Sequence, residues 1–398
     1  MILYSQFKTI LKDERLPAVI VDLDAFDRNL EKLAGLSQSS SKNFRVATKS
    51  LRIPALLARI LKRGAPSRGL MCYSAEEIEV LSKSPEGFDD FLLAYPVARE
   101  SELKALKRVH ESGKKVSAVI DSAAGVVRVA AQMHGLAQPF RLLIDVDASL
   151  RFFGLHLGVR RSPVRSANAV REILREAKKH PQVQIIGAMV YEAQVAGLGD
   201  RNPFKKLLNP LAKIVRKLSV TAVAKLREQI AQTFKDEGTP LEIFNGGGSG
   251  SFNFAAQEKC LTELTAGSGL LCSHLFDYYS NIQFEPACFF ALEAVRSSDP
   301  DHITCSGGGY IASGEPGWDR LPIPTLPAGL SLISTEGCGE VQTPLKMAQN
   351  RVEIGDPVLF RPAKAGELAE HFKEYLFVSN GKIVSRAPTY RGLGHCFF

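Results

Sequence analysis

The feature that most constrains the fold of this chain is a repeated change of hydrophobic period along its first 280 residues. Eight short apolar runs rich in Val, Ile and Leu are each followed by a longer segment with helical spacing. Continuous apolar runs are typical of strands buried on both faces of a parallel sheet. Eight such repeats over about 225 residues predict an α/β fold, a (β/α)8 TIM barrel; a doubly wound open sheet is the alternative that counting leaves open. The runs are residues 44–49, 69–74, 89–95, 115–121, 141–147, 183–191, 241–247 and 262–269.

Helix signals lie between these runs. Pro54 near the start and Gly64 at the end frame one helix, and Ser74 with Glu77 three residues later is a capping-box pattern for the next. Helical spacing continues in residues 163–181 and 203–238.

The periodicity also predicts where the barrel ends. After about residue 275 helical spacing fades, and short β-rich runs appear between glycines, prolines and aspartates. We therefore predict a barrel domain over residues 1–275 and a β-rich C-terminal domain over residues 276–398. An early run, residues 18–36, adds a strand and a helix ahead of the first barrel strand, and that strand can join the β-rich domain.

Composition narrows the class of protein. Apolar residues make up 45% and charged residues 23% of the chain, as in ordinary globular proteins. The sequence contains no run of 18 apolar residues, so we expect no membrane span. The first residues have neither the long apolar region nor the small-residue cleavage site of a secretory signal. Seven cysteines without a CxxC pair favour a reducing compartment, so we expect a cytoplasmic protein.

Positive charge dominates, with a formal net charge of +8. Such a balance can indicate a nucleic-acid partner, but aromatic residues are only 8% and no basic-aromatic stretch occurs. The densest basic stretch, residues 205–227, has helical apolar spacing, so we interpret it as a solvated helix face. We therefore expect neither a nucleic-acid partner nor a membrane partner.

A lysine ends the first predicted barrel strand. The chemistry of a TIM barrel takes place at the carboxyl ends of its strands, and Lys49 stands there in the stretch RVATKS. Partial burial at an apolar barrel mouth favours the neutral amine, which can form a Schiff base or act as a base. A solvated lysine at a strand end is the competing interpretation.

Two glycine-rich turns follow the seventh and eighth strands. The seventh strand runs into FNGGGSGSF (244–252), and the eighth ends in AGSG (266–269). Such turns expose backbone N–H groups that can surround an anion. TIM barrels often hold a phosphate at these two strand ends, so we predict a phosphate site there. Flexible surface turns are the alternative.

Polar side chains also follow the fifth and sixth strands. Arg151, Arg160 and Arg161 come after the fifth strand, where an arginine can hold an anionic oxygen or form a surface ion pair. Tyr191 and Glu192 come after the sixth strand and can hydrogen-bond a ligand or satisfy polar groups at the rim.

Together, these strand ends resemble fold type III pyridoxal-phosphate enzymes, the alanine racemase-like barrels. The likeness to the D-threonine aldolase and D-serine dehydratase branch lies in the opening LPAVIVDLDAFDRN, in RVATKS and in the two glycine turns. The later stretches GGGYIASG, EGCGEVQTP, RPAKAGE and PTYRGLGHCF look like the amino acid deaminase/aldolase subgroup. The likeness covers nearly the whole chain.

The resemblance implies roles for particular residues. Lys49 would form the Schiff base with pyridoxal 5′-phosphate, Arg151 would approach its phenolic oxygen, and Thr265 would be a neutral partner near its pyridine nitrogen. The stretch YEAQ (191–194) stands where the family has YEGH, with Gln194 in place of a ring-contacting histidine. Cofactor binding is implied for Lys49, Arg151, Tyr191, Gln194, Gly247, Gly248, Ser249, Thr265, Gly267 and Ser268.

The resemblance also concerns a metal. The family's C-terminal metal pair is usually spaced His-x-Cys or His-x-Asp, whereas His395 and Cys396 are adjacent here. Adjacent residues of an extended segment point to opposite faces, which makes joint coordination awkward. A divalent metal at His395 and Cys396 is therefore only weakly implied.

The function that the resemblance implies is a pyridoxal-phosphate-dependent lyase, acting as a homodimer on small D-amino acids with a β-hydroxyl group. Lys49, with Tyr191 nearby, would take the Cα proton. Loss of the hydroxyl then gives a 2-keto acid and ammonia, whereas Cα–Cβ cleavage gives glycine and an aldehyde. The candidates to shape that choice, unless they are surface charges, are Glu336, Glu340, Lys364 and Glu367.

Two other functions stay open. Racemisation needs a second base on the opposite face of the substrate; related racemases take a tyrosine from the partner subunit's C-terminal domain, and Tyr310 is the candidate catalytic residue here. A non-enzymatic pyridoxal-phosphate-binding protein is the other alternative, although proteins of that kind have a single barrel and lack the last 120 or so residues.

Overall fold

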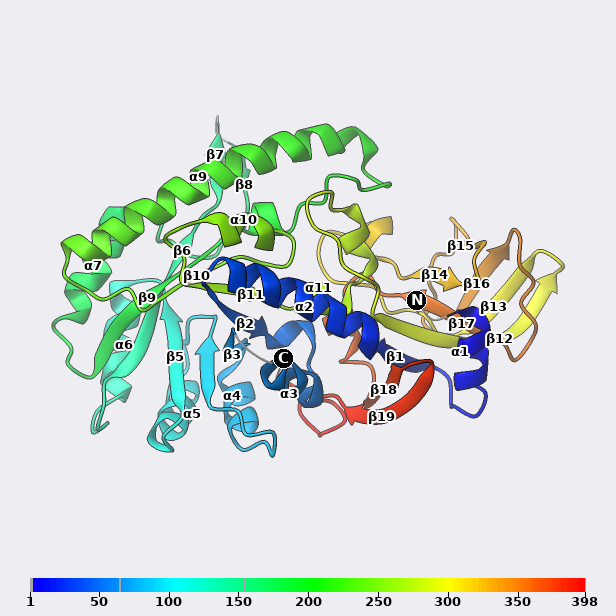
Figure 1. Ribbon diagram of the computed structural model, residues 1–398, viewed down its shortest axis with the longest axis horizontal. Helices are drawn as coiled ribbons and strands as arrows, with labels where there is room; N and C mark the ends of the chain where they lie inside the picture. Colours follow the sequence, from blue (N-terminus) through cyan, green and yellow to red (C-terminus); the bar gives the residue numbers. More distant parts are fainter. Residues whose placement is uncertain (1–2, 64–65, 153–154, 398) are drawn as a thin grey trace.

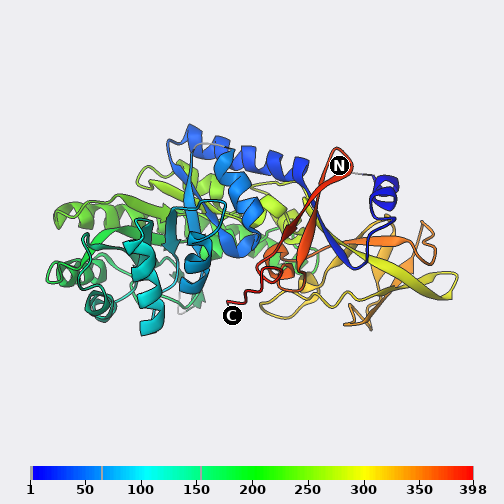
Figure 2. The same ribbon diagram turned by 90° about the horizontal axis from the view of Figure 1, so that it is seen from below.

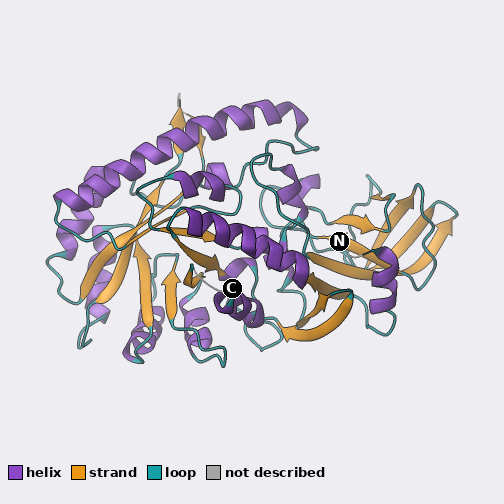
Figure 3. Ribbon diagram, viewed as in Figure 1, coloured by secondary structure: helices purple, strands orange, loops and turns teal. Residues whose placement is uncertain are grey.

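The computed structural model describes residues 3–63, 66–152 and 155–397, which form a closed barrel and a mostly antiparallel sheet (Figures 1 and 3). All eight apolar runs form barrel strands, and the eighth strand pairs in parallel with the first. The (β/α)8 prediction is therefore confirmed, and the open sheet is wrong. Around the barrel the strands are β2 (Asn43–Ala47), β3 (Ser67–Cys72), β4 (Asp90–Leu93), β5 (Lys115–Ile120), β6 (Phe140–Asp147), β9 (Val183–Tyr191), β10 (Ile243–Gly246) and β11 (Glu263–Ala266).

Helices cover the outside of the barrel. The Asp22 carboxylate caps the first of them by accepting the N–H groups of Asp24 at 3.0 Å and Ala25 at 3.1 Å, and Pro54 opens the next. The outer helices are α2 (Leu23–Ser39), α3 (Pro54–Lys62), α4 (Ala75–Ser82), α5 (Glu100–Glu111), α6 (Ala123–Gln132), α7 (Ala167–Ala177), α9 (Asn209–Asp236) and α10 (Phe252–Gln257).

The capping box predicted for α4 is only half formed. The Ser74 hydroxyl accepts the N–H of Glu76 at 3.2 Å, as an N-cap does. The Glu77 carboxylate turns inward instead, where it accepts the N–H of Tyr73 and the hydroxyl of Tyr390, both at 2.8 Å. The long-range bond to Tyr390 ties the carboxyl-terminal segment to the barrel, and no local pattern reveals it.

The second part is a nine-stranded sheet. Strand β1 pairs antiparallel with β12 and parallel with β18, so the early strand lies in this sheet and links it to the barrel through α2. The strands are β1 (Ala18–Asp22), β12 (Cys288–Asp299), β13 (His302–Ser306), β14 (Ile323–Leu326), β15 (Leu330–Leu332), β16 (Gln342–Met347), β17 (Pro357–Arg361), β18 (Glu374–Ser379) and β19 (Lys382–Pro388).

The two parts share a continuous apolar core. After β19 the chain returns to the junction between barrel and sheet (Figure 2), where the Tyr390 N–H donates to the Arg52 carbonyl at 3.0 Å. Among the helices of the described residues, none has the length and apolarity that a membrane crossing requires. The shorter elements are α1 (Tyr4–Ile10), α8 (Ala193–Ala196), α11 (Ser268–Leu271), α12 (Ala365–Leu368), a β7–β8 hairpin (Leu150–Phe152 and Leu155–Leu157), and 3-10 turns at Thr48–Ser50, Lys206–Leu208, His274–Tyr278 and Trp318–Arg320.

Candidate active site at the carboxyl end of the barrel

A cavity of about 380 Å³ opens at the carboxyl ends of the barrel strands. This is the end at which TIM barrels carry their chemistry. Eight of the predicted site residues line it: Lys49, Tyr191, Gly247, Gly248, Ser249, Thr265, Gly267 and Ser268. The lining residues that the sequence did not predict include Tyr95, Asp121 and Asp145.

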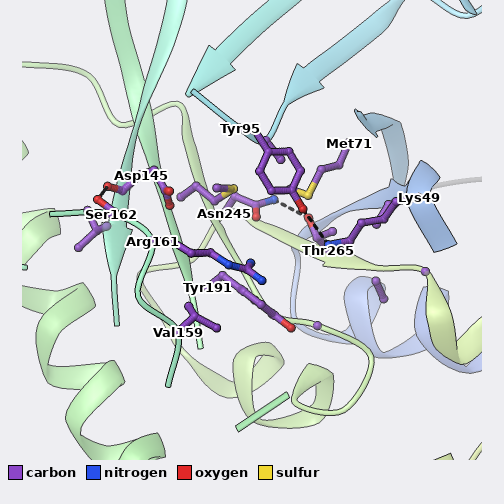
Figure 4. A pocket seen from close by; sticks show the side chains of 18 of the residues that line it. Lys49, Met71, Tyr95, Asp145, Val159, Arg161, Ser162, Tyr191, Asn245 and Thr265 are labelled. Atoms are coloured by element: carbon purple, nitrogen blue, oxygen red, sulfur yellow. Dashed lines mark hydrogen bonds between the residues drawn. The ribbon is translucent and has the colours of Figure 1, made fainter. Parts of the chain in front are cut away.

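Lys49 reaches the cavity from the 3-10 turn that follows β2. Its Nζ lies 3.0 Å from the Tyr95 hydroxyl and 5.7 Å from the centroid of the same ring (Figure 4). The Lys49 side chain is exposed, so the predicted partial burial of the amine is wrong. The Lys49 amine is instead oriented by the hydroxyl of Tyr95, which follows β4. In the sequence, Tyr95 is only one of several polar residues at strand ends.

The two glycine turns after β10 and β11 are joined to each other. The Ser249 hydroxyl accepts the N–H groups of Gly267 at 3.3 Å and Gly269 at 2.9 Å. A Cβ on Gly248 would lie 2.9 Å from the Tyr191 ring, and one on Gly267 would lie 2.7 Å from the Ala47 carbonyl oxygen. Only glycine permits this approach, so the two turns form one continuous backbone surface facing the cavity.

A buried glutamate supports the first of these turns from behind. Glu192 accepts the N–H of Gly247 at 3.2 Å and the hydroxyl of Ser251 at 2.6 Å, and it pairs with the fully buried Arg227. Arg227 also pairs with Glu258 at 2.5 Å. Glu192 therefore satisfies backbone and ion-pair needs under the turn, which is the second of the two interpretations that the sequence left open.

Thr265 ends a chain of side chains with a fixed hydrogen-bond direction. Arg45 donates to the Glu263 carboxylate at 2.8 Å, and the Asn245 amide donates to that carboxylate and to the Thr265 hydroxyl, both at 2.8 Å. Because a carboxylate accepts and does not donate, the amide nitrogen of Asn245 must face it. The Thr265 oxygen is thus an acceptor toward Asn245, and its own hydrogen is left to point into the cavity.

The arginine in the cavity differs from the one that the resemblance implied. Arg151 lies in the β7–β8 hairpin, is exposed and is not among the lining residues, whereas Arg161 lines the cavity and points toward its centre (Figure 4). The hairpin carries the chain out from the barrel after β6, and the chain returns only at Val159. Position after the strand indicated Arg151, Arg160 and Arg161 alike, and the choice of Arg151 came from the resemblance.

The remaining wall of the cavity is acidic. Burial and the neighbouring Asp121 raise the pKa of Asp145 to about 7, against the opposing effect of Arg161. Asp147 forms an ion pair with Arg165. The stretch IDVD at the end of β6 was the available signal for these carboxylates. Burial and the neighbouring Glu192 raise the pKa of Tyr191, which also lines the cavity, to about 12.

Two other predicted residues lie outside the cavity lining. Gln194 is buried and donates to the Ala148 carbonyl at 2.7 Å, so it holds the backbone near the site instead of facing a ligand. Tyr310 packs in the β-rich part with ring centroids 5.1 Å from Phe290 and 5.2 Å from Phe372. Tyr310 therefore does not supply the second base for racemisation to the cavity of its own chain.

The weakly implied metal residues do not converge on a ligand set. The His395 ring stacks on Phe397 with centroids 5.8 Å apart, and Cys396 is exposed. Within residues 3–63, 66–152 and 155–397, no group of three or more His, Cys, Asp or Glu side chains could hold a metal ion. Of the four charged residues proposed from the sequence to shape the reaction, Lys364 contacts Glu367 at 3.1 Å, and Glu336 and Glu340 are exposed.

Two aldolases are similar in sequence to this chain. A 3-hydroxy-D-aspartate aldolase of Paracoccus denitrificans is 24% identical over 254 residues, which are 63% of this chain and 59% of that protein. A D-threonine aldolase of Arthrobacter sp. is 24% identical over 297 residues, or 73% of this chain and 71% of that protein.

Solved structures show the same fold. A D-threonine aldolase from Filomicrobium marinum superposes with a TM-score of 0.81 at 20% identity over 96% of each chain. A D-threo-3-hydroxyaspartate dehydratase from Delftia sp. HT23 has a TM-score of 0.76 at 17% identity, over 96% of this chain and 98% of that one. Residues 21–271 match the family described as alanine racemase, N-terminal domain, and the chain belongs to that family.

Proposed function

We propose that this chain is a pyridoxal-phosphate-dependent lyase that acts on small D-amino acids with a β-hydroxyl group. The observation that carries the proposal is the meeting of Lys49 with the two joined glycine turns around one cavity of about 380 Å³. The likeness to aldolases and dehydratases of D-threonine and 3-hydroxyaspartate supports the substrate class.

The residues present fit this cofactor. The Ser249 hydroxyl already accepts two N–H bonds, so its hydrogen is available to a phosphate oxygen. The backbone surface that needs glycine at Gly248 and Gly267 allows a phosphate to approach closely. The Thr265 hydroxyl accepts a hydrogen bond from the Asn245 amide, so its own hydrogen can be donated to the ring nitrogen of the cofactor. A metal at His395 and Cys396 is not part of the proposal, because the side chains around them do not form a ligand set.

Each residue then has a defined task. Pyridoxal phosphate, when bound, supplies an electron sink for the charge that develops at Cα of the substrate. Lys49 would hold the aldehyde carbon of the cofactor, and its amine would take the Cα proton of the substrate. Tyr95 keeps the Lys49 amine directed into the cavity through their 3.0 Å contact. Arg161 is positioned to hold an anionic oxygen.

Two outcomes use the same binding residues. If the Cα proton is removed and the β-hydroxyl leaves as water, the products after hydrolysis are a 2-keto acid and ammonia. If the proton of the β-hydroxyl is removed and the Cα–Cβ bond breaks, the products are glycine and an aldehyde. The proposal covers both reactions, and product analysis separates them.

The test is absorbance and turnover of the purified protein with pyridoxal phosphate. We expect an absorbance band at ~410–420 nm that disappears on borohydride treatment. Mass spectrometry should then find the reduced cofactor attached to Lys49. Lys49→Ala should lose both the band and about 10³–10⁴-fold of the activity on D-serine or D-threonine, whereas Lys104→Ala, on the outer helix α5, should lose neither. Absence of the band in the unsubstituted protein would sink the proposal.

The same assay discriminates the alternatives. Turnover that exchanges D- and L-amino acids without keto acid, ammonia or aldehyde would indicate a racemase. If the cofactor is attached to Lys49 but no β-hydroxy D-amino acid is turned over, the chain is a non-enzymatic binding protein.

A further inference from the structure

Arg52, three residues after Lys49, has a backbone conformation that side chains seldom adopt. Its φ is +58°, in the left-handed region, where residues other than glycine are uncommon. A conformation of this kind costs free energy, persists only where the surrounding structure holds it, and occurs often at functional sites. The contacts that hold Arg52 in place are therefore a guide to what this residue does.

The Arg52 guanidinium joins the turn that carries Lys49 to the β-rich part. Its Nε donates to the Lys49 carbonyl oxygen at 3.1 Å, and its Nη1 donates to the Glu370 carboxylate at 2.6 Å. The guanidinium also lies over the Tyr73 ring, 5.4 Å from the centroid. Because Arg52 is only 7% exposed, solvent screens its ion pair with Glu370 little. One rigid, planar group thus links the Lys49 peptide to the segment that follows α12.

Helix α12 meets the same peptide directly. A Cβ on Gly366 would lie 2.3 Å from the Lys49 carbonyl oxygen and 2.7 Å from the Ser50 Cα, so only glycine allows α12 to come this close. The Arg52 carbonyl in turn accepts the Tyr390 N–H at 3.0 Å. The β-rich part therefore fixes the backbone of residues 49–52 through contacts from α12, from the segment after it and from the carboxyl-terminal segment.

The Lys49 side chain itself is held much less. It is exposed, and the Tyr95 hydroxyl at 3.0 Å is the one hydrogen-bond partner of its amine within the part of the chain that the structure describes (Figure 4). A lysine side chain is flexible, so the place that its amine can reach depends on where its backbone stands. A misplacement of about 1 Å can slow a reaction about hundredfold. The contacts around the Lys49 peptide can therefore control the reactivity of the amine.

We propose that Arg52 is a positioning residue, which together with Glu370 and Gly366 fixes the Lys49 peptide so that the amine meets the aldehyde of pyridoxal phosphate. This role rests on the proposed function, since it concerns the attachment of that cofactor. In the attachment the amine and the aldehyde join with the loss of one water molecule, and Arg52 neither gives nor takes an atom. The competing role for Arg52 is to hold the barrel and the sheet together without any effect on Lys49.

The first test compares two ligands that share the phosphate. Pyridoxal phosphate can attach to Lys49, whereas pyridoxine phosphate has an alcohol in place of the aldehyde and can only bind. Arg52→Asn keeps a residue that tolerates a left-handed backbone, but its side chain is too short to join Lys49 to Glu370. In stopped-flow absorbance the band of the lysine-bound cofactor should appear about tenfold to hundredfold more slowly. The affinity for pyridoxine phosphate in a fluorescence titration should be unchanged, because the two glycine turns keep their contacts.

Two further variants act on the same peptide. Gly366→Ala pushes against the Lys49 carbonyl without touching the ion pair, and it should slow the attachment about as much as Arg52→Asn does. Glu370→Gln leaves an acceptor for Arg52 and should slow the attachment less, since the hydrogen bond loses only the charge of its acceptor.

The outcomes separate positioning from stability. Arg59→Asn, the matched control, removes an ion pair with Asp27 from the outer helix α3, so it should lower the melting temperature and change neither ligand measurement. If Arg52→Asn weakens both ligands equally, or if the attachment keeps its rate in Arg52→Asn or in Gly366→Ala, Arg52 does not position Lys49. Those results leave the proposed function standing, whereas absence of the band from the unsubstituted protein would overturn both.

Discussion

The two walls of the cavity are built in different ways. The wall after β10 and β11 consists of backbone, in two glycine turns that Ser249 joins and Glu192 supports from behind. The facing wall consists of side chains, among them Tyr95, Asp145 and Arg161, which come from separate strand ends. A backbone wall needs glycine at consecutive positions and is therefore visible in the sequence. A side-chain wall depends on where each loop brings the chain back, and spacing alone does not give that.

The largest expected effect concerns the backbone wall. In Gly267→Ala the added Cβ would lie 2.7 Å from the Ala47 carbonyl oxygen and 2.8 Å from the Ser50 Cβ, so the turn must move away from β2. Overpacking of this kind costs about 1–3 kcal/mol, which corresponds to roughly tenfold to hundredfold weaker binding of pyridoxal phosphate in a fluorescence titration.

Gly35→Ala is the matched control, because a Cβ at that position in α2 meets no atom within 4 Å. If both variants bind the cofactor equally well, the two turns do not form a rigid phosphate surface. Comparing pyridoxal with pyridoxal phosphate locates the loss, which should be confined to the phosphorylated form.

The facing wall is tested by its arginine. Arg161→Gln removes a charged donor from the cavity and should lower kcat/KM for D-threonine or D-serine about tenfold to hundredfold, the range of a charge-assisted hydrogen bond. Arg151→Gln should leave kcat/KM unchanged, since that side chain lies outside the cavity lining. The reverse result would mean that the hairpin folds over the site and brings Arg151 into it.

These two residues also mark how far sequence reasoning reaches. The eight strands follow from apolar runs whose positions local patterning reveals, and Lys49 and the glycine turns follow because they stand at or after strand ends. Thr265 lies within β11, and only the resemblance singled it out. Arg151 and Arg161 both follow β6, but Arg151 lies within a hairpin that the sequence did not predict, whereas Arg161 follows that hairpin. Gln194 stood in a family motif, yet it faces the Ala148 carbonyl, because the turn into α8 points its side chain back to the barrel.

A smaller effect is expected for the hydroxyl that directs the lysine. Tyr95→Phe keeps the ring next to Lys49 and removes only the 3.0 Å contact. A neutral hydrogen bond contributes about 0.5–1.5 kcal/mol, so kcat should fall roughly threefold to tenfold. The pH at which the lysine-bound cofactor changes its absorbance should also shift. Tyr4→Phe, which removes a bond to the Pro357 carbonyl far from the site, should change neither quantity.

The smallest effect concerns Glu77, whose side chain bonds to the distant Tyr390 instead of capping its own helix. The sequence predicts a helix cap, but the carboxyl group is fully buried and accepts the hydroxyl of Tyr390. Burial raises its pKa to about 7, although the bond from Tyr73 acts in the opposite direction. The folded state therefore binds this proton more tightly than the unfolded chain. The resulting stabilisation is complete below the ordinary pKa and is lost as the pH rises through 7.

Glu77→Gln keeps a polar group at this position and removes its titration. The melting temperature of the variant, relative to the unsubstituted protein, should therefore rise by a few degrees between pH 5 and pH 8 in calorimetry. Glu76→Gln, at the exposed neighbouring position, should show no such relative rise. Parallel melting curves for the Glu77 variant and the unsubstituted protein would mean that Glu77 stays charged in the fold. In that case the contact between Tyr390 and the barrel would be a bond to a carboxylate, and acid would weaken that contact instead of strengthening it.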